Sequence, residues 1–200
     1  MERPRIMAKA QTYLAETPRT VTADRCERSD GGAHDFYSEG DYWWPNPEDP
    51  DGPYVRRDGE TNPANFIAHR QSMIRLSELM GTLVSAYLIT KEETYASKAV
   101  THLRAWFVEP KTRMRPSLLY GQAIKGKHTG RSIGIIDTLH LVEVARGAKI
   151  LCASPSFAVA DQKAVKAWFG DYLDWINSHE YGLKEKPVSY THLRAHETQR

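Results

Sequence analysis

Residues 111–131 hold the side chains with the clearest chemical pattern. This stretch, KTRMRPSLLYGQAIKGKHTGR, contains six Lys or Arg residues and one His but no Asp or Glu, and such a cationic segment suits an anionic partner. A hydroxyl, an amide, an imidazole and a guanidinium, which can together hold a carboxylate, come from Tyr120, Gln122, His128 and Arg131. The same composition is typical of a basic surface loop before a helix, so both interpretations stay open.

A second segment, residues 34–63, combines aromatic side chains, prolines and acids without helical or strand periodicity. Its aromatic residues are Phe36, Tyr37, Tyr42, Trp43, Trp44 and Tyr54. So much aromatic surface favours an ordered loop. One interpretation is a loop that closes one end of a helical bundle. The other adds a ligand, with Trp43 and Trp44 stacking on sugar rings while Arg56 and Arg57 bind hydroxyls or carboxylates. The two interpretations are compatible.

The sequence predicts neither a metal site nor a cofactor. The acids at 48, 49 and 51 lack the spacing of a calcium loop, so we interpret them as solvated turn residues. Cys26 and Cys152 lie far apart without the spacing of zinc ligands, and we expect both to be free thiols. His69 and Arg70, which lie on a predicted helix, are weaker candidates for ligand contact, because a lone His on a helix face is more often structural.

Composition and length limit the classes of protein that fit. The chain has 200 residues, 40% hydrophobic and 26% charged, with a formal net charge of +2. These values are typical of one globular domain and argue against a nucleic-acid-binding protein. No apolar run is long enough to predict a membrane span. The N-terminal residues lack the apolar core of a signal peptide.

Apolar spacing predicts an all-α fold without strands. Helices are expected over residues 3–16, 62–90, 90–107, 132–153 and 161–178. For the second helix, Asn62 is the expected N-cap and Pro63 the first helical residue, and Thr90 and Glu93 have the spacing of a capping box for the third.

The predicted helices would form antiparallel hairpins. In the last hairpin the two expected apolar faces are Ile135, Leu139, Val142 and Ile150 against Val165, Trp168, Phe169, Leu173 and Ile176. No repeat of fixed period supports a solenoid, so we favour a partial (α/α) toroid with long ordered loops.

Two strings carry a resemblance to a known family. GGAHDFYSEGDYWWPNPEDPDGPYVRRDGETNPANFIAHR and MRPSLLYGQAIKGKHTGRSIGIIDTLHLVEVARGAKIL resemble N-terminal signature blocks of the alginate lyase family of polysaccharide lyases. The resemblance covers roughly residues 4–182. It implies an incomplete (α/α) toroid and a monomeric, bacterial, periplasmic enzyme. It also implies cleavage of a uronate polysaccharide by β-elimination without a metal or another cofactor.

The resemblance also implies where the site residues lie. The expected substrate-binding residues are Tyr120, Gln122, Arg131, Trp43, Trp44, His69 and Arg70. The family's catalytic Asn-His pair, within an Asn-Asn-His run, and a later Arg and Tyr are expected downstream of WINSHEYG, and this sequence contains no such run. His128 stands where the family has Asn, so we assign it no catalytic role.

The C-terminal residues depart from the family pattern. VSYTHLRAHET resembles a translated sequencing adapter, so we expect residues 1–186 to form a truncated helical domain and residues 187–200, with His192 and His196, to be a foreign tail. The main prediction is a polysaccharide lyase that is inactive or impaired as this fragment. The alternatives are a carbohydrate-binding helical module without catalysis and a structural helical scaffold.

Overall fold

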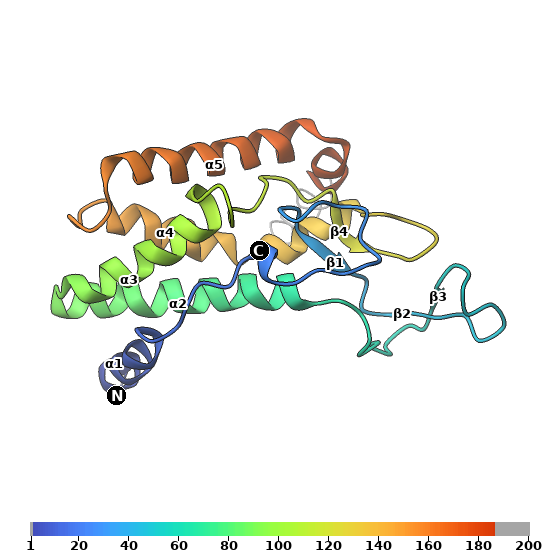
Figure 1. Cartoon of the computed structure of the whole chain (residues 1–200), viewed down its shortest axis with the longest axis horizontal. Helices are drawn as coiled ribbons and strands as arrows, with labels where there is room; N and C mark the ends of the chain where they lie inside the picture. Colours follow the sequence, from blue (N-terminus) through green and yellow to red (C-terminus); the bar gives the residue numbers. More distant parts are fainter. Residues whose placement is uncertain (1, 187–200) are drawn as a thin grey trace, which may run out of the picture.

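The computed structural model describes residues 2–186, and helices make up most of this part of the chain (Figure 1). The α-helices are α1 (Glu2–Tyr13), α2 (Ala68–Thr90), α3 (Glu93–Leu103), α4 (Leu141–Leu151) and α5 (Val159–Ser178). Residues 180–186 are also helical. The expected helix-rich fold is therefore confirmed. No helix within residues 2–186 is long and apolar enough to span a membrane. The predicted foreign tail, residues 187–200, lies outside the described residues.

Three shorter helical segments connect the main helices. They are the 3₁₀ helices η1 (Val21–Ala23) and η3 (Ser132–Thr138), and the π-helix η2 (Arg104–Val108). The π-helix continues α3 directly and carries Trp106 and Phe107, both buried, into the core. The Phe107 ring lies 4.6 Å from the Trp168 ring of α5, measured between centroids. Aromatic pairs at this distance add to the stability that burial provides.

Helix α2 is the central element of the core. Met73, Leu76, Met80 and Leu83 recur at intervals of three and four residues and are all buried. Such spacing places them on one side of the helix. The helix packs against α1, α3 and α4, and Figure 1 shows α3 running alongside it. Only two residues separate α2 from α3, and the first, Lys91, has the left-handed φ of 62° that ends many helices.

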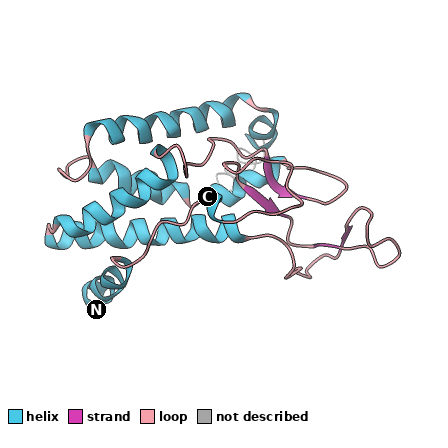
Figure 2. Cartoon of the chain, viewed as in Figure 1, coloured by secondary structure: helices cyan, strands magenta, loops and turns pink. Residues whose placement is uncertain are grey.

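The prediction that the chain contains no strands was wrong. Strand β1 (Tyr37–Glu39) pairs in parallel with β4 (Tyr120–Ala123), and β2 (Trp43–Trp44) pairs antiparallel with β3 (Val55–Arg56). Figure 2 shows both pairs beyond the N-terminal end of α2. Strands of two to four residues are too short to show a reliable alternating pattern. The two long loops of the sequence are thus ordered and paired.

The expected starts of two helices were also wrong. Helix α2 begins at Ala68, because Asn62 serves a turn instead: its Oδ1 accepts from the Ala64 N–H at 3.0 Å and its Nδ2 donates to the Trp43 carbonyl at 2.9 Å. Asn and Asp form such turns as readily as helix caps. No capping box begins α3. Thr90 ends α2, and the Glu93 carboxylate accepts from Ser154 and Ser156.

The predicted apolar face of the last hairpin was partly wrong. Leu139 and Val142 are 63% and 57% exposed, and Leu173 is exposed to a similar extent. The buried residues of α4 are Leu141, Val144, Gly147, Ala148 and Leu151. One regular α-helix was expected over residues 132–153, but its first seven residues form η3. A 3₁₀ segment has three residues per turn, so η3 rotates the faces of the helix that follows it.

Candidate functional site

The parallel pair of β1 and β4 brings the two long loops together. Its register joins Tyr37 to Tyr120 but Glu39 to Ala123, so β4 contains one more residue than β1 over this span. The irregularity coincides with Gln122, whose φ of 56° is left-handed. This conformation is uncommon for a residue other than glycine and often marks a functional constraint.

A close approach of two glycines places η3 against β4. A Cβ atom built on Gly134 would lie 2.8 Å from the Gly121 carbonyl carbon, which is closer than real Cβ atoms come. Only a residue without a side chain fits at this crossing. The close contact between Gly134 and Gly121 brings Asp137, near the end of η3, towards Gln122 on β4.

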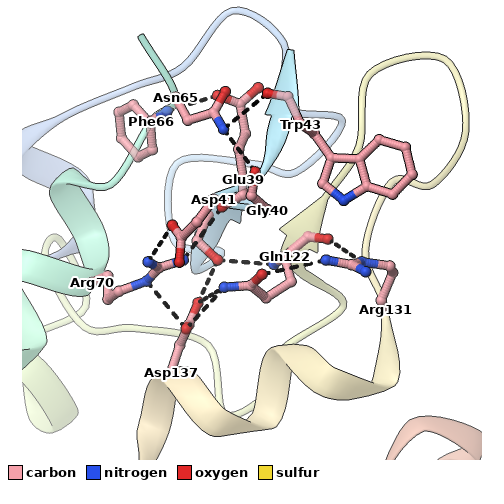
Figure 3. A network of polar contacts seen from close by, with 11 residues as sticks. Glu39, Gly40, Asp41, Trp43, Asn65, Phe66, Arg70, Gln122, Arg131 and Asp137 are labelled. Carbon is pink, nitrogen blue, oxygen red and sulfur yellow. Dashed lines mark hydrogen bonds and ion pairs between the residues drawn. The ribbon is translucent and has the colours of Figure 1, made fainter. Parts of the chain in front are cut away.

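Asp137 is the centre of a buried polar network (Figure 3). Its carboxylate accepts from the Ser38 hydroxyl at 2.5 Å and from the Gln122 side-chain amide at 3.2 Å. The Ser38 oxygen in turn accepts from the Gln122 backbone N–H at 2.8 Å. Arg70 Nε lies 3.1 Å from Asp137 Oδ1 as an ion pair, although its N–H is not aligned for a hydrogen bond. Ser38 and Asp137 are both buried, so the network fixes its members tightly.

Arg131 is held at the edge of this network by Gln122. Its Nε donates to the Gln122 backbone carbonyl at 2.7 Å, and its Nη2 donates to the Gln122 side-chain oxygen at 3.3 Å. Within residues 2–186, no acid lies at ion-pair distance from this guanidinium. Burial and then the charge of Arg56 lower the pKa of Arg131, while Asp137 opposes them. Arg131 is therefore a partly desolvated cation that lacks an anionic partner.

Trp43 lies beside Arg131, whereas Trp44 faces elsewhere. A Cβ atom on Gly40 would lie 2.7 Å from Trp43 Cδ1 and 2.9 Å from Arg131 Nη2, so both side chains crowd against this glycine; Figure 3 shows the two together. Lys127 Nζ lies 5.0 Å from the centre of a Trp43 ring. Trp44 instead donates from its indole to the Glu60 carbonyl at 2.9 Å. Neighbouring residues of a strand point to opposite sides, which separates the two indoles.

Two ion pairs fix the backbone around Gly40. Arg28 binds both carboxylate oxygens of Glu39 at 2.6 Å, and the Phe66 N–H donates to the same carboxylate at 2.7 Å. Burial raises the pKa of Glu39, but these hydrogen bonds outweigh it and bring the pKa below its usual value. Arg70 Nη1 donates to Asp41 at 2.8 Å. Arg70 therefore links the two acids Asp41 and Asp137. Because these acids balance its positive charge, Arg70 is less suited than Arg131 to bind an anionic ligand.

His69 and Tyr120 lie outside the group around Arg131. His69 Nδ1 accepts from the Tyr37 N–H at 3.0 Å, and its Nε2 lies 3.0 Å from the Asp24 carbonyl, so both ring nitrogens bind backbone. Burial lowers the pKa of His69, which favours the neutral ring. The Tyr120 ring packs close to Gly31 and against the small cluster around Tyr37. Both residues shape the β1–β4 pair.

The tips of the two loops add positive charge near this group. The Tyr54 N–H donates to the Lys125 carbonyl at 3.1 Å, and Lys125 Nζ lies 5.7 Å from the centre of the Tyr54 ring. Gly126 packs closely against Pro53. Within residues 2–186, no three His, Cys, Asp or Glu side chains are arranged to hold a metal ion. The loop tips present cations and aromatic rings together.

The structure thus brings together four of the predicted residues: Trp43, Arg70, Gln122 and Arg131. Of these, Arg131 and Trp43 have groups left for a ligand, whereas Arg70 and Gln122 act within the network. Sequence reasoning missed Ser38 and Asp137. The available signal for Asp137 was an acid within the apolar stretch SIGIIDTLHL, where an unpaired carboxylate would be costly.

Comparisons with known proteins agree on the family. The model of the family described as alginate lyase matches residues 20–193. The structure is similar to the crystal structure of an alginate lyase from Bacteroides ovatus, with a TM-score of 0.83 and 35% sequence identity; the match covers 92% of this chain and 49% of that one. The chain thus spans about half the length of that protein. Comparison with curated proteins gave no match. The family match covers well over half of the sequence, so the chain belongs to the alginate lyase family.

Proposed function

We propose that the longer protein is a polysaccharide lyase that cleaves a uronate polysaccharide such as alginate by β-elimination, and that Arg131 binds the substrate carboxylate. One observation carries the proposal: Arg131 is partly desolvated, hydrogen-bonded only to the neutral Gln122, and without an acid at ion-pair distance within residues 2–186. A partly buried cation with no acid at ion-pair distance gains more from an anionic ligand than a cation that is already paired. A uronate carboxylate is such an anion.

The chemistry explains why a lyase needs such a cation. β-Elimination removes the proton at C5 of the uronate, next to its carboxylate, and breaks the bond from C4 to the glycosidic oxygen. The C5 proton becomes acidic enough only when the carboxylate charge is neutralised. Three of the five N–H donors of the guanidinium remain for a carboxylate, because the Nε hydrogen and one Nη2 hydrogen are used by Gln122. Trp43 offers an aromatic face beside them.

The base and the acid of the reaction are proposed to lie in another part of the longer protein. The proposal is supported by the family resemblance, which implies an Asn-His pair and a Tyr downstream of residue 182, and by the match of this chain to about half of the B. ovatus enzyme. We therefore propose that these 200 residues alone are inactive or impaired. A partial (α/α) toroid, a monomeric state and a periplasmic location remain proposals from the same resemblance. So does the domain boundary at residue 187, which the family match crosses.

A carbohydrate-binding module without catalysis is the second candidate. It is favoured by His69, the histidine next to the network, because both of its ring nitrogens are engaged by backbone and neither is free to remove a proton. In this alternative the site around Arg131 binds an anion, and His69 does not act as a base. This alternative predicts binding of acidic oligosaccharides and no new unsaturated sugar ends.

The test uses a form of the protein that spans the full length of its relative, with Arg131→Ala, Arg131→Lys and the control Arg5→Ala. Cleavage is followed by the ultraviolet absorbance of the unsaturated uronate. Removing a desolvated charge that pairs with substrate should lower kcat/KM by about a hundredfold, with part of it retained in Arg131→Lys. Arg5 is exposed on α1 and, among the described residues, pairs only with Glu2, so its loss should change little. Equal rates in the Arg131 and Arg5 variants would contradict the role of Arg131. Binding without product would favour the module.

A further inference from the structure

A row of aromatic rings runs along α5 and into the segment that follows it. The rings of Tyr172 and Trp175 are nearly parallel, at 8°, and Trp175 and His179 stack with centroids 4.9 Å apart. Tyr181 meets His179 edge-on at 4.9 Å. Because Trp175 lies parallel to rings on both sides, the row is poorly suited to stacking on a sugar. It is suited to fixing the positions of its two ends, Tyr172 and Tyr181.

The first end of the row contacts the residue next to Asp137. The hydroxyl of Tyr172, a buried residue, lies 2.6 Å from Thr138 Oγ1. Thr138 Oγ1 already donates to the Ile135 carbonyl at 2.8 Å, so Tyr172 is the donor in the first bond. Burial raises the pKa of Tyr172 to about 12, which keeps its hydroxyl protonated at neutral pH. This bond fixes the C-terminal end of η3, where Asp137 lies.

The second end of the row contacts the residue next to Arg131. The Tyr181 hydroxyl donates to the Gly130 carbonyl at 2.9 Å. Gly130 lies close against the backbone of Leu119, since a Cβ atom on Gly130 would lie 1.8 Å from the Leu119 carbonyl oxygen. His179 Nδ1 accepts from the Tyr181 N–H at 3.2 Å, which sets the direction of the helical segment 180–186. In Figure 1 this segment follows α5 on the side of β4.

The two tyrosines therefore hold both ends of residues 130–138, the segment that carries Arg131 and Asp137. We propose that Tyr172 and Tyr181 are positioning residues, which orient the Arg131 guanidinium for the substrate carboxylate by anchoring its segment to α5 and to the helical segment 180–186. This inference rests on the proposed function. It assigns to α5, which carries none of the predicted site residues, a role in substrate binding.

Two measurements on the 200-residue chain test the inference. The first is calorimetric titration with short mannuronate oligosaccharides, for Tyr181→Phe, Tyr172→Phe, Arg131→Ala and the control Tyr95→Phe on α3. Each of the two positioning variants removes one hydrogen bond, so the Kd should rise about fivefold. The second is the nitrogen-15 NMR signal of the Arg131 Nε–H, without ligand. This signal should shift in Tyr181→Phe and stay in place in Tyr95→Phe.

The outcomes separate the two proposals. If Arg131→Ala and Tyr181→Phe both weaken binding, and the Arg131 signal moves in Tyr181→Phe while its melting temperature stays near that of the parent, the positioning role is supported. If Arg131→Ala weakens binding and Tyr181→Phe behaves like Tyr95→Phe in both measurements, the positioning role is wrong and the carboxylate site stands. If Arg131→Ala leaves binding unchanged, the carboxylate site is wrong and the positioning role falls with it. Should the parent chain not bind, an unmoved Arg131 signal in Tyr181→Phe refutes the anchoring by itself.

Discussion

Replacing Asp137 by Asn should destabilise the protein far more than replacing Asp41 by Asn. Both acids pair with Arg70, at 3.1 Å and 2.8 Å, so the two substitutions remove the same kind of charge from the same partner. They differ in burial: the Asp137 side chain is 4% exposed and that of Asp41 is 39% exposed. The comparison therefore sets a buried acid, which also accepts from Ser38 and Gln122, against an exposed acid that pairs with the same arginine.

The expected magnitudes follow from that difference. Breaking a buried ion pair typically costs about 3–5 kcal/mol, whereas a surface pair contributes about 0–1 kcal/mol. Arg70 keeps Asp41 in the Asp137 variant, so we take the lower end, about 3 kcal/mol. The new amide group of Asn would also face a donor, either the Ser38 hydroxyl or the Gln122 amide. For a chain of this size, about 3 kcal/mol corresponds to a fall in Tm of about 6–12 °C.

Urea denaturation followed by circular dichroism measures the free energy of unfolding for the parent and both variants. Asp137→Asn should lose about 3 kcal/mol and Asp41→Asn less than about 1 kcal/mol, with the same dependence on urea concentration. If the two variants lie within about 1 kcal/mol of each other, the buried network around Asp137 does not hold the fold as argued.

Two further predictions concern packing and pH. Gly134→Ala should destabilise the protein and weaken uronate binding, because its Cβ would meet the Gly121 backbone at 2.8 Å. Gly170→Ala, in α5 with open space around it, should instead stabilise the protein by about 0.5–1 kcal/mol. Thermal melts of both variants measure the difference, and equal melting temperatures would contradict the prediction. Burial lowers the pKa of His102 from 6.5 to about 4. The unfolded chain therefore binds the proton first as pH falls, and stability should decrease by up to about 3 kcal/mol between these pH values. His102→Phe should reduce this dependence of the unfolding free energy on pH. Urea titrations at several pH values measure it, and an unchanged dependence would show that His102 is not its source.

The helices could be predicted from apolar spacing, but their ends could not. The pattern over residues 68–90 predicts a helix because Met73, Leu76, Met80 and Leu83 follow its period. The expected start at Asn62 failed for a reason that lies outside the local sequence. An Asn before Pro fits a helix cap and a turn equally well, and the choice is made by the Trp43 carbonyl, which Asn62 reaches across the loop.

The candidate site was predicted only where the residue type itself indicated chemistry. Arg131 and Trp43 were recognised because a cation in a basic stretch and an indole in an aromatic loop suggest ligands. Ser38 was not, since a serine is common in loops and its partner Asp137 is 99 positions away. The left-handed Gln122 has no sequence signature, because the β-bulge that imposes it depends on pairing with a distant strand.

The parallel pairing of β1 with β4 also has a consequence for the order in which the chain folds. Tyr37 meets Tyr120 only after the chain between them, including α2 and α3, has been made and compacted. Closing such a long loop costs entropy that local helices do not pay, so distant strand pairs form slowly. During synthesis on the ribosome, the aromatic segment 34–63 emerges well before β4. Its strand β1 therefore stays unpaired until β4 has been synthesised. The segment proposed to contribute to ligand binding is therefore one whose nascent chain needs protection from aggregation.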